Sequence, residues 1–532
     1  PPDDRHGLPS FRRVLDSVHE AWLERGAELT EQGRELMRRI DDQSRPKAST
    51  EPLTNSLLSH AVAHITESFD PTYGGFGTAP KFPQAPVLEF LLNAAAHDLG
   101  RSREMVSTTL RRMALGGIYD QLGGGFARYS VDPTWLIPHF EKMLYDNAQL
   151  ARVYLHAWQS TKEPLYKRIA EETLDYMLSD LLLSHGGFAA SEDADSEGVE
   201  GRFYVWSYEE FADIAPDAVD YYNVRREGNF EGGSILTASS DDPPESRTTL
   251  LEHRSKRIRP ARDDKALTSW NGLAIGALAE AGAALRRSDF IAAASRAANF
   301  LLERCVIEGR LMHSHRESIT KVTGMLEDYA YLCEGLLTLY EVTFDGRWYE
   351  AAASLANQMV ELFWDEGDGG FFTTGSDHEK LIVRQKELVE SAKPCPSAVA
   401  TAVLQKLAVL QGSPELHRKA TEVLRQAHTY MARAPQVSGT FLRALEAYLV
   451  PPREIVVMGE RDDPSTRALL GEIFSGFLPN KVVAGGPPTI DSPLLEGKTV
   501  IDGKPTAYVC RNYTCEAPVT AAEELRSQLT GS

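Results

Sequence analysis

From residue 51 to residue 450, apolar positions recur with helical spacing, and polar breaks separate one helical stretch from the next. A separate amphipathic stretch runs from Phe11 to Ile40, and a linker rich in Ser, Pro and Lys follows at 43–50. The pattern predicts an N-terminal segment over 1–50 and a helical domain over 51–450.

The pattern of apolar and polar residues changes after Pro451-Pro452. Short apolar runs there predict strands, and one helical run between them predicts a helix. The predicted strands are Glu454–Met458, Lys481–Ala484 and Ala507–Cys510, and the predicted helix is Pro464–Phe477. We therefore predict a small α/β module over 451–532.

The helical domain contains an internal repeat marked by Gly-Gly-Phe turns. The turns lie at 74–76, 124–126, 186–188 and 369–371, so the steps are 50, 62 and 183 residues, the last being three times 61. Tyr145-Asp146-Asn147 is matched by Trp270-Asn271-Gly272 after 125 residues and by Glu327-Asp328-Tyr329 after 182. One unit is therefore a helical hairpin followed by a Gly-rich connection.

Such hairpins must stack, because a single hairpin cannot bury both of its helices. They can form an open solenoid or close into a barrel. The connections are long, carry aromatic and charged residues, and sit at the same phase of each unit, which favours closure around one pocket. We predict a mainly α protein with an (α/α)6 barrel over 51–450 and a pocket at the loop end of its inner helices. The alternative is that the glycines serve only as turn residues.

Charge and composition narrow the possible functions. Acidic residues outnumber basic ones 76 to 56, giving a net charge of −20, which disfavours nucleic acid or an anionic membrane as a partner. No run of 18 apolar residues is present, so we expect no membrane span. Only five cysteines occur, which is typical of a reducing compartment, so we expect a cytoplasmic protein. The chain opens on Pro1-Pro2 without Met, so we expect a processed chain or a fragment. Phosphate-loop and nucleophile-elbow motifs are absent, and we predict no cofactor.

The densest group of chemistry-bearing residues lies at 123–147. Pro138 suits the first turn of a helix, which would place His139, Lys142 and Asp146 on one helix face. Such a trio at the start of an inner helix can bind hydroxyl groups or transfer a proton. The alternative is an ion pair that only stabilises the helix start.

Two further segments carry candidate residues. The run Asp193-x-Asp195-x-Glu197-Gly198 resembles the first half of a calcium loop, but Tyr204 stands where that loop needs a bidentate Glu, so we predict no metal. An acidic turn or a pair of acid–base carboxylates are the alternatives. His313 and His315 alternate in a strand-like piece, so only one of them can face the pocket. Cys510 and Cys515 are predicted to be two buried thiols rather than a redox pair.

These segments resemble one family, the large thioredoxin-domain proteins of the spermatogenesis-associated, domain-of-unknown-function type. The resemblance covers nearly the whole chain and is carried by 122–150, 192–206, Asp264-Lys265, Asp328-Tyr329 and 508–518. It implies a barrel similar to N-acylglucosamine 2-epimerases and six-hairpin glycosidases. It also implies that 1–50 is the tail of a thioredoxin-like domain absent from this chain, which would then be a partner of the barrel.

We predict a carbohydrate-active enzyme of the epimerase or isomerase type, acting on a sugar or sugar derivative with His139 and His315 as the two proton carriers. The other predicted catalytic residues are Asp146, Asp264 and Asp328. The predicted substrate-binding residues are Arg128, Tyr129, Trp135, Glu141, Lys142, Tyr145, Glu192, Asp193, Asp195, Arg202, Trp206, Lys265, Trp270, Asn271, Glu327 and Tyr329.

Two alternatives stay open. A glycoside hydrolase would need two carboxylates of the set Glu192, Asp193, Asp264 and Asp328 facing each other across the pocket. A non-catalytic barrel would instead bind the thioredoxin-like domain or a client protein, and it predicts a filled interior and an exposed apolar patch.

Overall fold

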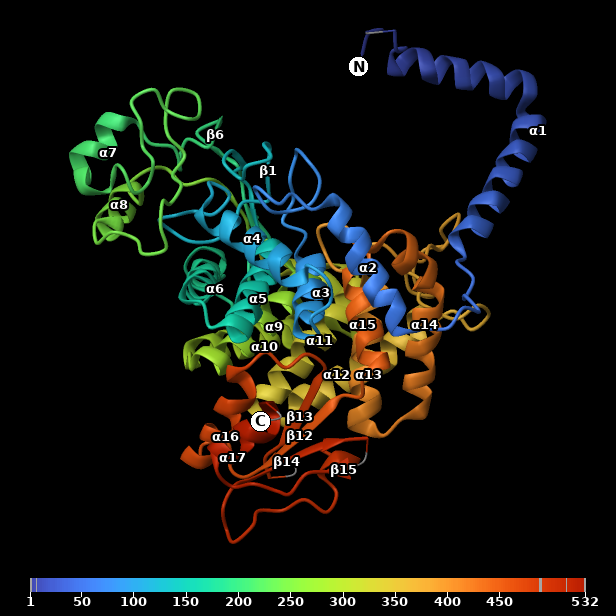
Figure 1. Ribbon diagram of the computed structural model, residues 1–532. Coiled ribbons are helices and arrows are strands. Elements are labelled where there is room, and N and C mark those ends of the chain that lie inside the picture. Colours follow the sequence, from blue (N-terminus) through green and yellow to red (C-terminus); the bar gives the residue numbers. More distant parts are fainter. Residues whose placement is uncertain (1, 6, 488–489, 513, 531–532) are drawn as a thin grey trace.

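The helices of the computed structural model, which describes residues 2–5, 7–487, 490–512 and 514–530, form a closed double ring (Figure 1). Each inner helix packs against the next, and the last packs against the first. In ring order the inner helices are α3 (Ala85–Ala96), α5 (Leu144–Thr161), α9 (Thr268–Leu285), α11 (Leu326–Thr343), α13 (Pro396–Gln411) and α15 (Gly439–Leu449). The outer helices, each against its inner partner, are α4 (Ser102–Leu115), α6 (Pro164–Tyr176), α10 (Ser288–Arg304), α12 (Gly346–Phe363), α14 (Pro414–Arg433) and α2 (Asn55–Ser68). The predicted (α/α)6 barrel is confirmed.

The repeated Asn residues fasten the Gly-Gly-Phe turns to the inner helices. Asn147 accepts a hydrogen bond from the amide of Phe126 (2.7 Å) and donates to its carbonyl (3.1 Å). Asn271 does the same for Phe188, at 2.7 and 3.1 Å. Both amides are fully buried, so the repeat seen in the sequence is a repeat of turn anchors.

A second repeated interaction is an ion pair between an Asp in the turn and a buried Lys. The Asp accepts backbone N–H groups of its own turn and forms an ion pair with the Lys. The three pairs are Asp70–Lys81 (2.8 Å), Asp120–Lys142 (2.9 Å) and Asp365–Lys386 (2.7 Å). Lys142 was predicted to bind substrate, and its place in this series shows that it holds a turn instead.

Glycine is required at Gly125, where φ is +79° and an added Cβ would lie 2.5 Å from the Tyr176 ring. Gly125→Ala is expected to cost about 1 kcal/mol in backbone strain and a further 1–3 kcal/mol in overpacking. Gly198, at φ +77° with open space around its Cβ position, is the matched control and should show only the strain. Urea unfolding of both variants measures the difference, and equal losses would contradict the packing argument.

The chain around Pro138 does not start a helix, which corrects the prediction of a shared helix face. Pro138 and His139 form strand β2 against β1 (Tyr129–Ser130), and β3 (Lys142–Met143) pairs with β4 (Ser191–Glu192). Helix α5 begins only at Leu144. Strand pairing therefore sends His139 and Lys142 to different surroundings from Asp146.

The connections at the loop end carry the remaining small elements. The strands are β5 (Asp195–Ser196), β6 (Val199–Glu200), β7 (Arg262–Asp263), β8 (Ala266–Leu267), β9 (Val306–Ile307), β10 (Arg310–Arg316) and β11 (Ile319–Thr323). The helical pieces are α7 (Tyr208–Ile214), α8 (Arg247–Arg254), a π-helical turn at Met177–Leu181, and 3-10 turns at Pro216–Ala218 and Pro435–Val437; a further 3-10 turn, Pro493–Leu495, belongs to the C-terminal module. Most of these elements surround the N-terminal ends of the inner helices.

The C-terminal module packs against the opposite end of the barrel from these connections (Figure 1, red). Its sheet has the order β13 (Lys481–Gly485), β12 (Arg453–Met458), β14 (Thr506–Arg511), β15 (Thr514–Cys515), with β12 and β13 parallel. Helices α16 (Pro464–Ser475) and α17 (Ala522–Thr530) complete it. One apolar core runs through barrel and module, so the two form one packed body.

Cys510 and Cys515 face each other across β14 and β15 and are joined by a disulfide. This corrects the prediction of two thiols, because the hairpin turn between the two residues brings them into register. Cys305, Cys333 and Cys395 are free and buried.

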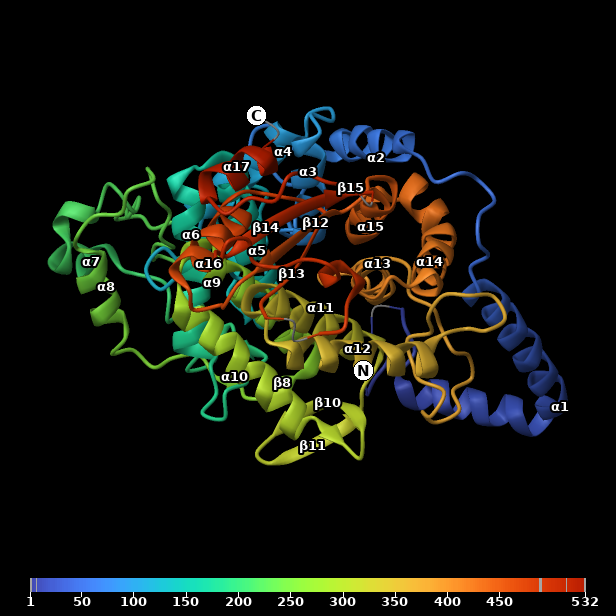
Figure 2. The same cartoon turned by 90° about the horizontal axis from the view of Figure 1, so that it is seen from below.

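Helix α1 (Phe11–Ser44) projects from the body and lies apart from the barrel in both views (Figures 1 and 2). It leaves apolar side chains exposed, among them Leu15, Val18 and Trp22. In the described part of the chain, no helix combines the length and the apolar character that a membrane span requires.

Candidate active site

The N-terminal ends of three neighbouring inner helices bring polar and aromatic side chains together on the barrel axis. Tyr145 on α5, Trp270 on α9 and Glu327 on α11 lie one or more turns above residues that line the barrel interior on the same helix faces. Tyr145 and Trp270 meet edge to face with ring centroids 4.7 Å apart, and Lys393 lies 5.9 Å from the Trp270 ring. We call Tyr145, Trp270, Glu327, Lys393, His313 and Asp328 the mouth cluster.

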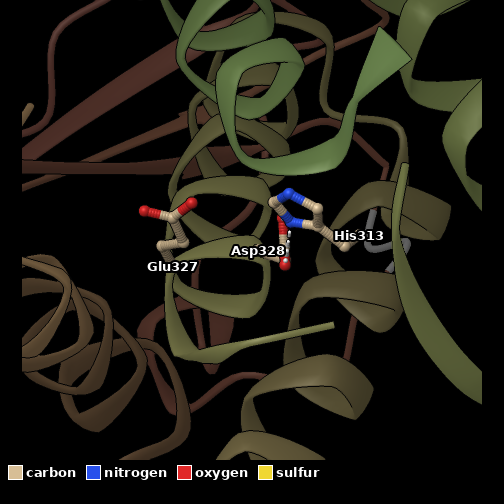
Figure 3. A group of neighbouring side chains, drawn as sticks. All are labelled: His313, Glu327 and Asp328. Atoms are coloured by element: carbon tan, nitrogen blue, oxygen red, sulfur yellow. Dashed lines mark hydrogen bonds and ion pairs between the residues drawn. The ribbon is translucent and has the colours of Figure 1, made fainter. Parts of the chain in front are cut away.

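His313 and Asp328 form a hydrogen-bonded pair within this cluster. The His313 Nδ1 atom lies 2.9 and 3.2 Å from the two Asp328 oxygens (Figure 3). Asp328 is fully buried, and it also accepts the amides of Ser269 (3.0 Å) and Met325 (2.8 Å), which fix the carboxylate. Among the described residues nothing is hydrogen-bonded to His313 Nε2. The arrangement orients an imidazole and leaves one ring nitrogen available.

The environment of His313 favours its charged form. The hydrogen bond to Asp328 raises the pKa of His313 above the ordinary 6.5, against the opposing effect of burial, and the charges of Asp328 and Glu327 act in the same direction as that bond. An imidazole with a raised pKa is a stronger base, and a carboxylate on its other nitrogen stabilises the imidazolium that forms.

His315, two residues further along β10, has different neighbours from His313. It hydrogen-bonds Thr320 (2.8 Å) and lies edge-on to His185 and Phe300. The prediction that alternation separates the two histidines was wrong, because residues two apart in a strand share a face; His313 is the one that contacts Asp328 on α11. His139 is in a third place, so His139 and His315 have no neighbour in common among the described contacts.

Glu327 binds the ammonium group of Lys393 and accepts the hydroxyl of Ser269 (3.3 Å). His313, Glu327 and Asp328 offer ligand atoms within 4.8 Å of one another, which is close enough for a metal ion. Their oxygens are, however, already occupied by backbone amides, an imidazole and an ammonium group. The donor set therefore fits acid–base chemistry better than metal ligation.

Several predicted residues extend the mouth cluster along one side. Arg128 and Glu141 form an ion pair (3.0 Å), and His139 lies 3.6 Å from Glu141 and 2.8 Å from Glu200. The Tyr129 ring stacks on His139, with centroids 5.1 Å apart. The structure thus brings Arg128, Tyr129, His139 and Glu141 together in one group.

Asp146 lies beside this group and is buried with one carboxyl oxygen unpartnered. Burial raises the pKa of Asp146 well above the ordinary 3.8, outweighing Arg128, which lowers it, while Glu141 raises it further. These surroundings therefore favour the protonated form of the carboxyl. Neutral carboxylic acids in such sites act as proton donors.

The raised pKa of Asp146 predicts how stability varies with pH. Above about pH 4 the folded protein keeps a proton that the unfolded chain releases, so this residue's contribution to stability is lost as pH rises toward its folded pKa. Asp146→Asn should flatten the fall of Tm between pH 5 and 8 and be no less stable than wild type at pH 8. Asp264→Asn, at a surface ion pair, is the control. Parallel Tm curves for Asp146→Asn and wild type would refute this explanation.

Four predicted binding residues are used by the fold instead. Trp135 and Trp206 are completely buried and present no face to a ligand; the Trp135 indole N–H donates to the Tyr73 carbonyl (2.8 Å). The side-chain amide of Asn271 is hydrogen-bonded to the backbone of Phe188 in the Gly-Gly-Phe turn, so it is not available to a ligand. Tyr329 is buried, and its hydroxyl anchors Arg310 at the start of β10.

The acidic segment and its neighbours form local pairs away from the mouth cluster. Glu192 is buried against Arg259 (2.8 Å) and Tyr176 (2.9 Å). The other predicted members lie on the surface or in short ion pairs: Asp193, Asp195, Arg202 with Glu197, Asp264 with Arg262, and Lys265 with Asp263. Of the carboxylates considered for a glycosidase, Glu192 and Asp264 are each held by an arginine, Arg259 and Arg262.

A cavity lies inside the barrel, below the mouth cluster, rather than at the loop end. It has a volume of about 510 Å³ and is lined by all six inner helices and by the module. Its charged residues, such as Arg152, Glu280 and Glu334, were missed by sequence reasoning. The available signal was an isolated charge in an otherwise apolar inner helix, as Glu280 in the Ala- and Gly-rich run 274–284.

Comparisons with known proteins identify relatives along the whole chain. Spermatogenesis-associated protein 20 of Homo sapiens is 32% identical over 99% of this chain and 76% of its own length. The protein of the same name from Rattus norvegicus is 31% identical with the same coverage, and an uncharacterized protein of Caenorhabditis elegans is 29% identical over 99% of this chain and 80% of its own. No family model matches the chain.

Solved structures with a similar arrangement have much lower identity. D-mannose isomerase is 11% identical, with a TM-score of 0.48 over 71% of this chain and 87% of that one. A family 105 glycoside hydrolase of C. acetobutylicum is 10% identical, with a TM-score of 0.45 over 74% and 99%. Cellobiose 2-epimerase of Spirochaeta thermophila is 16% identical, with a TM-score of 0.33 over 74% and 99%. The barrel assignment rests on the ring of helices itself.

Proposed function

This chain belongs to the family of spermatogenesis-associated protein 20, and we propose that it is a sugar-active enzyme of the epimerase or isomerase class with its proton transfers at the mouth cluster. The observation that carries the proposal is the His313–Asp328 pair. It holds an imidazole in one tautomer, raises the pKa of His313, and leaves Nε2 on the side away from the carboxylate.

His313 is the proposed general base. Its Nε2 takes the proton from the sugar carbon next to the carbonyl, and the electron pair of the C–H bond moves into an enediolate. The Nδ1–H group of His313 stays hydrogen-bonded to Asp328 throughout. For isomerisation the hydroxyl proton of the enediolate moves to the former carbonyl oxygen, and the same nitrogen returns its proton to the neighbouring carbon, which leaves the carbonyl on the other carbon. For epimerisation a second group must supply a proton on the other face, and we assign this role to Asp146, whose protonated form burial favours.

The substrate class follows from the surfaces around the base. Trp270 is only half-buried and offers an apolar ring to the C–H face of a sugar. The ion pairs Glu327–Lys393 and Arg128–Glu141 place acceptors and donors side by side, as hydroxyl groups require. Glu327, Tyr145 and Trp270 are thus proposed to bind the substrate.

Hydrogen exchange in D2O tests the proposal. The whole chain is incubated with aldoses, ketoses and N-acylated amino sugars, and NMR follows deuterium at the carbon next to the carbonyl. Deuterium entering one of these sugars together with its epimer or isomer is the expected result. Release of monosaccharides from oligosaccharides without exchange would overturn the proposal in favour of hydrolysis, and no reaction with any of these sugars would overturn it in favour of a binding barrel.

A further inference from the structure

We propose that the interior of the barrel is a second binding site, separate from the mouth cluster, for a neutral polyhydroxylated small molecule reached from the module end. The cavity of about 510 Å³ lies within the range of small-molecule sites. Every inner helix contributes to its wall, and the module adds Phe474, Phe477 and Lys481.

The charged groups of this cavity are locked into one network. Glu280 lies 2.8 Å from Arg152, 3.2 Å from His156 and 3.4 Å from Lys481. The other nitrogen of His156 lies 2.9 Å from Glu89, and Arg152 also binds Glu334. Because both nitrogens of His156 are engaged, this imidazole cannot exchange a proton with a ligand without breaking the network. The site is built to hold a ligand, whereas the mouth cluster, with a free imidazole nitrogen, is built to transfer a proton.

The protonation of the network is fixed by the same contacts. Burial lowers the pKa of His156, but the Glu89 and Glu280 carboxylates more than compensate, so its pKa is raised. Burial opposes ionisation of Glu280 as well, yet Arg152, His156 and Lys481 hold the pKa of Glu280 well below its ordinary value. The contacts therefore favour the charged form of both groups, and each has a partner of opposite charge.

The balance of charge indicates which ligand the cavity takes. The lining carboxylates Glu89, Glu280, Glu334, Glu341 and Glu454 are matched by Arg152, Lys406, Arg443, Lys481 and the protonated His156. A net charge near zero gives no preference for an anion or a cation. A hydroxyl group can donate to a carboxylate edge and accept from a guanidinium without breaking an ion pair.

Polar atoms without a hydrogen-bond partner, on residues that line the cavity, point to the same class of ligand. Asn93 is 5% exposed, donates through its NH2 group to Glu446 (2.8 Å), and leaves Oδ1 without a partner. The Arg443 Nε and Gln405 Oε1 atoms, on α15 and α13, are also unpartnered. A buried polar atom without a hydrogen bond is costly, and a molecule carrying several hydroxyls would satisfy both the acceptors and the donor.

Access comes from the module end because a strap crosses the loop end. The strap, residues 392–394, is held by Gln149 on the Ala392 carbonyl (3.1 Å), by Tyr331 on the Pro394 carbonyl, and by the Lys393–Glu327 pair. At the other end the lining residues His417, Pro451 and Asn512 are exposed. The strap thus separates this cavity from the mouth cluster.

Titration calorimetry on the full chain tests the second site, with D-glucose, D-mannose and maltose as neutral probes and D-glucose 6-phosphate and D-glucosamine as charged ones. At least one neutral sugar should bind more tightly than both charged probes. Ala402→Phe, which fills the cavity from α13, and Asn93→Leu should each weaken that binding at least tenfold. Ala292→Phe, at an exposed position on α10, is the matched control and should bind as wild type does. Circular dichroism and Tm confirm that each variant is folded.

Two results would overturn the second site: no binding of any neutral probe at millimolar concentration, or full binding by the folded Ala402→Phe or Asn93→Leu variants. His313→Asn separates this inference from the proposed function. It should abolish deuterium exchange and leave binding by calorimetry unchanged, whereas loss of calorimetric binding in His313→Asn would show that the two sites are one and overturn the inference.

Discussion

His313→Asn should lower the rate of deuterium exchange by roughly 100- to 10,000-fold, the usual contribution of a positioned general base. Asn keeps a hydrogen bond to Asp328 but cannot take up a proton. KM should change little, because the substituted atom acts on the reacting carbon rather than on the hydroxyl groups. Initial rates measured by NMR over a range of sugar concentrations separate the two parameters, and added imidazole should restore part of the rate.

The same strand supplies a sharp comparison. His315→Asn changes the same residue type two positions along β10, where the side chain contacts Thr320 instead of Asp328, and should retain exchange. Asp328→Asn should have an intermediate effect on the rate and shift its pH profile toward lower pH, because the pKa of His313 would fall. Equal loss in His313→Asn and His315→Asn, or no loss in either, would contradict the assignment of His313.

Glu280→Gln should lower the free energy of unfolding by about 3–5 kcal/mol, as expected when one partner of a buried ion pair is removed. Glu280 is 5% exposed and faces three cations, Arg152, His156 and Lys481. The neutral amide would leave these three groups without the negative charge that balances them, in a cavity wall that excludes most water. Lys481 would also lose its partner in the barrel, and with it one link between the barrel and the module.

Urea unfolding followed by circular dichroism measures this loss. Glu415→Gln, an exposed residue in the first turn of α14, is the control and should change stability by less than about 0.5 kcal/mol. A change in Glu280→Gln no larger than in Glu415→Gln would mean that the network does not stabilise the fold.

The ring of helices could be predicted because its signals are local. Gly-Gly-Phe turns recur at regular steps, and an Asn near the start of two inner helices repeats with them; the structure shows Asn147 and Asn271 making the same hydrogen bonds. The strands and helix of the module were also readable, since apolar runs and prolines mark them. Only the start of α5 was misplaced, because Pro138 suits a strand edge as well as a helix start.

The site was harder to predict because it depends on the direction in which each side chain points and on how deeply it is buried. The spacing of residues along the sequence determines neither. The sequence singled out His313 and His315, but it did not show which of them meets α11. Trp135 and Trp206 have the residue type of a sugar platform, yet both are buried. The charges of the interior, such as Arg152 and Glu280, looked like ordinary helix residues, because their partners lie on other helices.

The central claim is that closure of the ring places His313 over a sugar carbon at the mouth cluster. A crystal structure with a sugar that undergoes exchange, soaked into Asp146→Asn crystals to slow turnover, tests it most directly. The account predicts a sugar ring against Trp270, with His313 Nε2 within roughly 3.2 Å of the carbon next to the carbonyl or of its hydroxyl. A sugar bound elsewhere, with His313 Nε2 facing solvent or protein alone, would contradict it.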